Sequence, residues 1–370
     1  MAYTIDKTNP IPRYLQIRQI IEDQIRSGKY GPGSRLPGER DLAAIFGVSQ
    51  MTVNKAILSM VRDGWLRREV GNGTFVMDDL EVPRPETVTV GFAVPFSTTF
   101  AEDDIYLGSL MRGIQNALLN QPASFKALET PPERLYDCVM EAGLDGWILT
   151  DVLQTSLDDI VRLRQDGQKI VILGADEDPI HVPYVDSDNI TGTREAVEHL
   201  LSLGHRRVAG AFMYLGKCNS RQRLASFRDT LRRNGVPVEE DFIIDLGDGE
   251  PLAGEKRERI ASIFVRPDRP TALLCGGFYA ALDMMQIARD AGLEIPTDLS
   301  VVGFDDPLAA RYLSPPLTTV RQPLEEMGQC AMTYLCEWLL QGKEPPQRTV
   351  LPDTFVVRES TAPAKGSNFF

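Results

Sequence analysis

Hydrophobic positions in the first sixty residues recur at helical spacing. An apolar stripe at intervals of three and four predicts a helix over residues 12–30, which ends at Gly28 and the glycine-proline turn after it. A second helix is expected over residues 38–46, where Gly47 breaks it. Ser49 is placed to cap a third helix that runs to Asp63. The buried stripe expected on that third helix is Val53, Ala56, Ile57 and Met60. This order predicts a helix-turn-helix.

Short β-prone runs follow the third helix. Residues 65–76, WLRREVGNGTFV, contain two such runs joined by Gly71, Asn72 and Gly73. A glycine-rich turn between two β-prone runs is typical of a hairpin. We therefore expect a wing beside the helix-turn-helix, in a domain of residues 1–77. Residues 78–87 are charged, carry Pro83 and Pro85 and show no apolar period, which predicts a semi-rigid linker.

From Val88 onward, apolar or β-branched runs alternate with helical stretches. The expected strands are residues 88–94, 124–128, 146–150, 169–173, 206–212, 241–245, 271–275 and 299–304. The expected helices are residues 107–120, 132–142, 157–165, 190–203, 221–234, 254–265 and 278–291. Such alternation predicts an α/β fold of parallel sheets covered on both faces, and the length of residues 88–362 favours two doubly wound lobes, before a flexible tail at 363–370. Ligands of such folds bind where strands end, at the loops after Val94, Thr150, Phe212, Cys275 and Phe304.

Charge is distributed unevenly along the chain. The net charge is -13, yet residues 1–77 carry eleven basic against seven acidic side chains. A basic module on an acidic body is the arrangement expected of a protein that meets nucleic acid only at one end. The sequence shows neither a signal peptide nor an apolar run long enough to span a membrane, so we expect a cytoplasmic protein without a membrane partner. The five cysteines are scattered and lack a CxxC, which favours buried free thiols.

Other function classes find little support in the residues. The chain contains no phosphate-binding loop, nucleophile elbow or HExxH, and His181, His199 and His205 are not spaced as metal ligands. We therefore expect no enzyme, no catalytic residue, no cofactor and no metal. A solute-binding protein for a transporter would suit the α/β body, but not the missing signal peptide or the helix-turn-helix. A winged helix used only for protein contact is a further alternative.

Particular motifs bring a family resemblance. Residues 10–77 resemble the GntR family of winged helix-turn-helix regulators through the segments PRYLQIRQIIEDQIRSGKYGPGSRLPGERDLAAIFGVS, TVNKAI and DGWLRREVGNGTFV. Residues 88–360 resemble the effector domain of the LacI/GalR family, which is similar to periplasmic sugar-binding proteins. The motifs that carry this second resemblance are Asp188-Asn189, AVEHLLSLGHRRVA, RQRLASF, SVVGFDD and SPPLTTVRQP. The combination is similar to the arabinose repressor subgroup.

The GntR resemblance implies a DNA-reading surface. In that family the third helix enters the major groove and its first turn faces the base edges. Gln50 and Asn54 can each pair with adenine, whereas the family more usually places arginine at these positions, so a different operator is expected. Arg67 and Arg68 flank the wing, although surface charge alone would explain that pair. The implied DNA-binding residues are Arg35, Arg40, Ser49, Gln50, Thr52, Asn54, Lys55, Arg68, Gly71, Asn72 and Gly73.

The LacI/GalR resemblance implies an effector cleft between the lobes. Arg223 matches the arginine that holds ligand hydroxyls or a carboxylate, and Asp305 matches an acidic acceptor of sugar hydroxyls. Gly277 and Phe278 replace an Asn-Asp pair found in many relatives, so Phe278 either stacks on the ligand or belongs to the core. The further candidates are Tyr106, Trp147, Asp151, Asp188 and Ser220, of which Trp147 has core packing as its alternative.

The resemblance also implies a mechanism. A carbohydrate bridges the lobes, closes the cleft and changes the spacing of paired DNA-binding heads, so that a repressor leaves its operator. A homodimer on a pseudo-palindromic operator follows from this arrangement. A non-sugar metabolite is the alternative effector.

Overall fold

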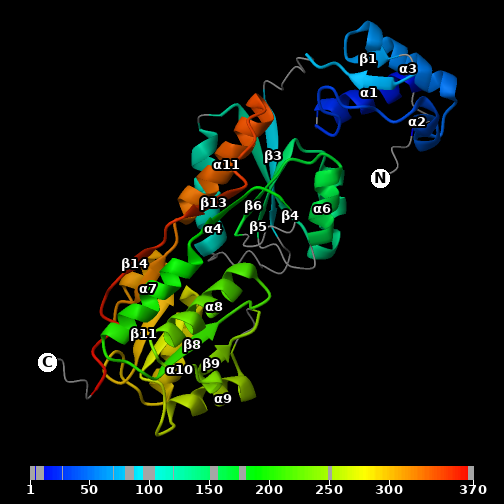
Figure 1. Cartoon of the computed structure of the whole chain (residues 1–370). Coiled ribbons are helices and arrows are strands. Elements are labelled where there is room, and N and C mark those ends of the chain that lie inside the picture. Colours follow the sequence, from blue (N-terminus) through cyan, green and yellow to red (C-terminus); the bar gives the residue numbers. More distant parts are fainter. Residues whose placement is uncertain are drawn as a thin grey trace.

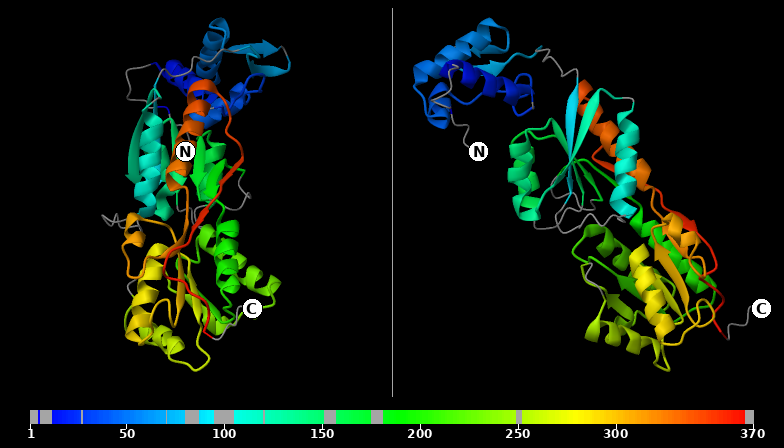
Figure 2. Two further views of the ribbon diagram at one scale, coloured as in Figure 1. Left: turned by 90° about the vertical axis from the view of Figure 1, so that its left-hand side faces the viewer. Right: turned by 180° about the vertical axis from the view of Figure 1, so that it is seen from behind.

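The computed structural model describes residues 5, 12–26, 28–69, 71–79, 87–94, 105–119, 121–150, 157–174, 181–248 and 252–365 of the 370. A small helical domain at the N-terminus stands at one end of an elongated molecule, and two α/β lobes follow it (Figure 1). Figure 2 shows the lobe that contains strands β3 to β7 and β13, lobe 1, between the N-terminal domain and the lobe that contains strands β8 to β12 and β14, lobe 2. The expected linker falls mostly on residues 80–86, which lie outside the described residues.

The N-terminal domain is a winged helix-turn-helix, as the apolar pattern predicted. Its elements are α1 (Arg13–Arg26), α2 (Glu39–Phe46), α3 (Gln50–Arg62), β1 (Leu66–Glu69) and β2 (Gly73–Val76). Gly47 ends α2 in the left-handed conformation, with φ 61°. The Ser49 hydroxyl caps α3 by accepting a hydrogen bond from the Thr52 amide at 3.3 Å. The four residues of the α3 stripe are buried against α1 and α2, and β1 pairs antiparallel with β2 to form the wing.

Lobe 1 is a six-stranded parallel sheet with helices on both faces. Its strand order is β13-β7-β6-β5-β3-β4, with β3 (Val88–Val94), β4 (Ala123–Glu129), β5 (Gly146–Thr150), β6 (Ile170–Leu173), β7 (Tyr184–Ser187) and β13 (Arg348–Leu351). One face carries α4 (Ile105–Leu118) and α11 (Leu324–Gln341), and the other carries α5 (Leu135–Ala142) and α6 (Leu157–Gln165). The short helix η1 (Pro132–Arg134) leads into α5.

Lobe 2 repeats the plan with one reversed strand. Its strand order is β14-β12-β11-β10-β8-β9, with β8 (Val208–Phe212), β9 (Ile243–Asp245), β10 (Ala272–Cys275), β11 (Ser300–Phe304), β12 (Thr318–Arg321) and β14 (Thr354–Val356). Only the β12–β14 pair is antiparallel in this sheet. One face carries α7 (Asn189–Ser202) and α8 (Cys218–Arg233), and the other carries α9 (Gly254–Phe264) and α10 (Phe278–Asp290). Two short helices, η3 (Glu240–Phe242) and η4 (Leu308–Arg311), complete the lobe.

The chain crosses between the lobes three times. These crossovers follow β7 at residues 187–189, β12 at residues 321–324 and β13 at residues 351–354. The third returns the chain to lobe 2, where β14 pairs with β12. All three crossovers lie together where the lobes meet, so a change in the angle between the lobes must pass through these residues.

The sequence pattern did not predict five of these elements: β7, β12, α11, β13 and β14. The four strands among them are only three or four residues long. Helix α11 returns to lobe 1 and packs closely on α4 through glycines on both helices. A Cβ atom at Gly113 would lie 1.9 Å from the carbonyl oxygen of Glu325, and one at Gly328 would lie 2.2 Å from that of Leu110. Glycine is therefore required at this crossing.

The cysteines agree in part with the expectation of buried free thiols. All five cysteines are free, and Cys275 and Cys336 are buried while Cys138, Cys218 and Cys330 are half-buried. Burial raises the pKa of Cys336 to about 11, so this thiol stays protonated at neutral pH.

No single helix among the described residues has the length and apolarity to cross a membrane. The one bent pair that passes by length and composition is α2 with α3, at 115°.

Candidate effector site and candidate nucleic-acid interface

Arg223, on α8, is held rigidly at the junction of the lobes. Its side chain is only 4% exposed. Nε donates to Oδ1 of Asn189 at 2.8 Å, Nη1 donates to the carbonyl oxygen of Gly276 at 2.7 Å, and the guanidinium lies 3.7 Å from the ring centroid of Phe304. The remaining nitrogen, Nη2, is buried and has no hydrogen-bond partner in the described structure. An unsatisfied buried donor of this kind is rare and marks a place where a ligand acceptor would be favourable.

The first crossover supplies the support for Arg223. Asp188 caps α7 by accepting a hydrogen bond from the Thr191 amide at 2.9 Å. Asn189 follows it and is itself buried, with Nδ2 3.3 Å from the carbonyl oxygen of Ser187. The Asp188-Asn189 motif therefore begins α7 and fixes the arginine, and the carboxylate of Asp188 has a helix cap as its local role.

Asp305 lies at the end of β11 and joins the first two crossovers. Its backbone is in the left-handed region, with φ 69°, and its carbonyl oxygen accepts a hydrogen bond from Thr319 Oγ1 at 2.6 Å. Its Oδ1 accepts a hydrogen bond from Gln322 Nε2, and Gln322 Oε1 in turn accepts one from Ser187 Oγ at 2.8 Å. The acidic side chain of this strand end is thereby linked to both lobes.

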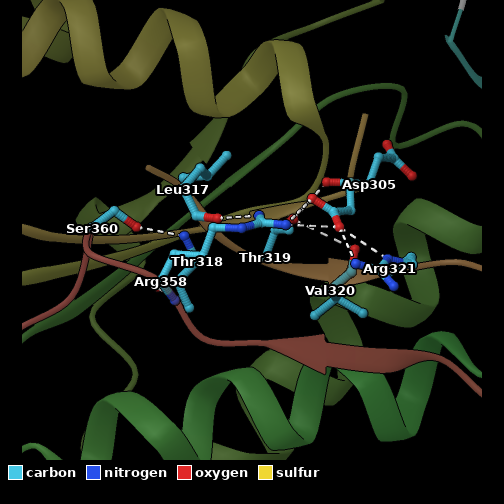
Figure 3. A network of polar contacts seen from close by, with 9 residues as sticks. Asp305, Leu317, Thr318, Thr319, Val320, Arg321, Arg358 and Ser360 are labelled. Atoms are coloured by element: carbon cyan, nitrogen blue, oxygen red, sulfur yellow. Dashed lines mark hydrogen bonds and ion pairs between the residues drawn. The ribbon is translucent and has the colours of Figure 1, made fainter. Parts of the chain in front are cut away.

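Figure 3 shows how the neighbouring segments are fixed around Asp305. The Thr318 amide donates to Ser360 Oγ at 2.8 Å, and Arg358 donates to the carbonyl oxygen of Leu317 at 2.6 Å. The fully buried carboxylate of Asp306 forms ion pairs with Arg321 at 2.6 Å and with Arg358 at 2.7 Å. These contacts attach β12 and the C-terminal segment to the end of β11, so the loop that carries Asp305 is rigid.

Asp353, on the third crossover, is a candidate that the sequence analysis missed. Both of its carboxylate oxygens are buried without a hydrogen-bond partner, because the nearby Ser187 hydroxyl donates to Gln322 instead. The pKa of Asp353 is raised to about 7, first by burial and to a smaller extent by the charges of Asp305 and Asp188, against the opposing effects of Arg223 and Ser187. No periodic element contains this residue, so only the structure brings it to the junction.

Of the other expected ligand residues, one lies beside Arg223, one lies in lobe 1 and one is outside the described residues. Ser220 is buried on the first turn of α8, one turn before Arg223. The hydroxyl of Tyr106, on α4, lies 3.2 Å from where a Cβ at Gly174 would be, at the end of β6. Asp151 lies outside the described residues.

Two aromatic candidates belong to cores. Trp147 is fully buried within lobe 1, where its ring packs on the backbone of Gly91, so the core alternative describes it and we remove it from the site. Phe278 is 5% exposed, packs in a core cluster of lobe 2 and meets Tyr279 edge-on at 5.6 Å. Its burial favours an anchor for α10 over a face for stacking. The Gly277-Phe278 departure therefore removes polar groups without adding an exposed ring.

The expected base-reading residues lie on the first turns of α3. Ser49 and Thr52 hydrogen bond to each other through their hydroxyl oxygens at 2.8 Å. Lys55 extends over the ring of Tyr14, with Nζ 4.1 Å from its centroid. The Gln50 side chain is exposed and makes no hydrogen bond within the described structure. Gln50 is therefore the polar side chain of this turn that is free to meet another molecule.

Glu39, which the sequence analysis did not single out, holds two of the expected DNA contacts. Asn54 Nδ2 lies 3.0 Å and 3.1 Å from the two Glu39 carboxylate oxygens, and Arg68 forms an ion pair with the same carboxylate. Arg40, the next residue, is exposed with no ion pair in the described part of the chain. Glu39 on α2 thus holds the side chains of Asn54 and Arg68 in place, whereas Arg40 has no ion pair within the described residues.

The wing is shaped by glycines and internal ion pairs. Gly71 and Gly73 have φ of 79° and 121°, and Asn72 Nδ2 donates to Glu69 at 2.8 Å. A Cβ at Gly73 would lie 2.8 Å from Nε of the exposed Arg35, so the guanidinium lies directly on the wing. Arg67 forms ion pairs with Glu69 and with Asp78, which favours a structural role for this arginine.

Comparisons with known proteins agree with both halves of the chain. Residues 13–76 match the family of bacterial regulatory proteins, gntR family, and residues 197–361 match the periplasmic binding protein-like domain. An arabinose metabolism transcriptional repressor of Geobacillus stearothermophilus is 29% identical over 348 residues, which are 90% of this chain and 93% of the relative. The HTH-type transcriptional regulator DegA of Bacillus subtilis is 30% identical, over 62% of this chain and 68% of the relative.

A solved structure gives the same result for the two lobes. The LacI family transcriptional regulator from Enterococcus faecium with bound ribose has a TM-score of 0.62 and 25% identity, and the match covers 75% of this chain and all of that one. The resemblances of residues 10–77 and 88–360 predicted this combination. The chain belongs to the bacterial transcriptional regulators in which a gntR-family helix-turn-helix precedes a periplasmic-binding-protein-like domain.

Proposed function

We propose that this regulator is a repressor that binds operator DNA through its winged helix-turn-helix and is released when a carbohydrate binds between the two lobes. The observation that carries the effector half is Arg223: two of its nitrogens are fixed to lobe 2, and the third is buried without a partner. A planar donor fixed in this way suits a hydroxyl or carboxylate oxygen of a ligand. The ribose bound by the Enterococcus faecium regulator supports a sugar.

The DNA half rests on α3 and the wing. Exposed Gln50 and Arg40 lie beside a positioned Asn54 and Arg68, which gives polar side chains for base edges and cations for phosphates. The local basic excess of residues 1–77 supplies the attraction to DNA. The names of the Geobacillus stearothermophilus and Bacillus subtilis relatives support regulation of transcription.

Effector and DNA are coupled through the three crossovers. Ser187, Asp305 and Gln322 form a hydrogen-bonded chain across the first two, so ligand binding at Arg223 acts on the segments that set the angle between the lobes. A closed pair of lobes in a homodimer would change the separation of the two winged helices and their fit to a pseudo-palindrome. We therefore propose a homodimer, without enzymatic activity and without a cofactor.

Full-length protein and a panel of mono- and disaccharides test this proposal. Sugars that raise the thermal midpoint are then added to the protein bound to a duplex selected from a random library. We expect salt-dependent DNA binding that one such sugar weakens. A non-sugar metabolite that does the same would replace the carbohydrate in the proposal. A protein that selects no duplex at any ionic strength would overturn it.

A further inference from the structure

Met51 is the most exposed large hydrophobic side chain in the described structure, at 83%. It lies on the first turn of α3, one residue after the free Gln50. The other side chains of these first turns are engaged within the domain: Ser49 with Thr52, and Asn54 with Glu39. Within the described residues, Met51 and Gln50 are therefore the two side chains that project from this end of the helix without a hydrogen bond, ion pair or ring contact.

The direction of Met51 follows from the helical period. The buried stripe of α3 lies on one face, and Met51, Lys55 and Leu58 follow one another at intervals of four and three on the opposite face. Leu58 is 49% exposed and lies two turns further along. In a helix-turn-helix, the outward face of the N-terminal turns enters the major groove. Met51 is central to that face.

We propose that Met51 reads the 5-methyl group of a thymine in each operator half-site, beside an adenine paired by Gln50. This inference rests on the proposed function. The thymine methyl is the apolar group that base pairs present in the major groove, so an apolar side chain there distinguishes thymine from the other bases. Methionine is flexible and polarizable, which suits contact with a methyl group at a site that polar readers surround.

The alternative occupant of this face is a second copy of the chain. Met51 and Leu58 together would then contact a partner domain, and replacement of either would change association rather than base preference. Gln50 and Lys55 border Met51 on α3, and this favours DNA, because these polar neighbours suit base edges and phosphates. The experiment separates the two.

Selection from a random duplex library tests the base preference. Full-length wild type, Met51→Ala, Met51→Gln and a control, Leu119→Ala, are each used to select duplexes. Leu119 is 82% exposed and follows α4 in lobe 1, so it matches Met51 in exposure but not in place. We expect the wild type and the control to select one thymine position in each half-site. Met51→Ala should lose that preference alone, and Met51→Gln should shift it toward adenine.

Deoxyuridine then removes only the methyl group. In the selected duplex, replacing that thymine by deoxyuridine should weaken wild-type binding about fourfold for each half-site, the value of one buried methyl group. Binding by Met51→Ala should not change on the same replacement. Identical selection by wild type and Met51→Ala would overturn the inference and leave the proposed function intact, as would altered association with unchanged selection. Failure of the wild type to select any duplex would instead overturn the proposed function.

Discussion

Arg223→Lys is expected to separate the two roles of this arginine, which are to hold α8 against the first crossover and to meet a ligand. Lysine keeps the positive charge, but its single nitrogen cannot reach all the acceptors that the three guanidinium nitrogens of Arg223 face. In the wild type, Nε and Nη1 satisfy Asn189 Oδ1 and the carbonyl oxygen of Gly276, and Nη2 is free. The substitution therefore leaves at least one buried acceptor unpartnered and removes the directed third donor.

The magnitudes follow from these contacts. One unpartnered buried acceptor costs about 1–3 kcal/mol, which should lower the stability of the ligand-free protein by that amount. Loss of a charge-assisted hydrogen bond to the ligand is worth about 1.5–3 kcal/mol, or about ten- to a hundredfold in affinity. Arg223→Ala leaves two acceptors unpartnered and should abolish the ligand-induced thermal shift altogether.

Calorimetric titration with the best sugar from the thermal screen measures the affinity, and thermal unfolding without sugar measures the stability. Arg221→Lys is the matched control, since Arg221 lies on the same helix and donates to the carbonyl oxygen of Gly216, in the loop that leads into that helix. Sugar affinity that stays at the wild-type value in a folded Arg223→Lys protein would refute the assignment of Arg223 to the effector site.

Three further predictions concern stability. The raised pKa of Asp353 means that the folded protein keeps this proton to a higher pH than the unfolded chain does. The free-energy cost of ionising Asp353 in the folded protein therefore grows as pH rises from 3.8 to about 7. Asp353→Asn removes that cost, so it should raise the thermal midpoint at pH 8 and leave it nearly unchanged near pH 4. Gly113→Ala should lower the midpoint by several degrees because the new Cβ would overlap the backbone of α11. Gly108→Ala, on the open side of α4, should not. Asp306→Ala leaves the half-buried Arg358 without its carboxylate and should cost about 3–5 kcal/mol in urea unfolding, whereas an unchanged midpoint would show that the ion pair is dispensable.

Periodicity predicted the elements that are long or capped. The three N-terminal helices, the Ser49 cap, the wing and, apart from β7, the alternation up to residue 304 are present in the structure, because each shows its own apolar period or turn residues. The end of the chain was not predicted. Helix α11 returns to lobe 1 and β14 to lobe 2, and their partners, α4 and β12, are distant in sequence. Local pattern carries no information about such pairing.

The family resemblance implied roles for Arg223 and Asp305, and its motifs contain Asn189 and Gln322 without indicating that these side chains hold Arg223 and Asp305 in place. The support from Asn189, Gln322 and the Gly276 carbonyl depends on three crossovers meeting, which no spacing reveals. The sequence analysis also named Trp147 as a candidate with core packing as its alternative, and the structure buries it in a strand of lobe 1. Aromatic residues in short strands are ambiguous in this way, since the same sequence suits a core or a ligand face.

The most direct test of the coupling between effector and DNA uses one titration. A selected duplex is held at a fixed concentration with the full-length protein, and fluorescence anisotropy follows DNA binding as the best sugar is added. The account predicts that the sugar lowers DNA affinity at least tenfold for the wild type and that Arg223→Lys requires correspondingly more sugar. DNA affinity that is the same with the sugar site empty and saturated would contradict it.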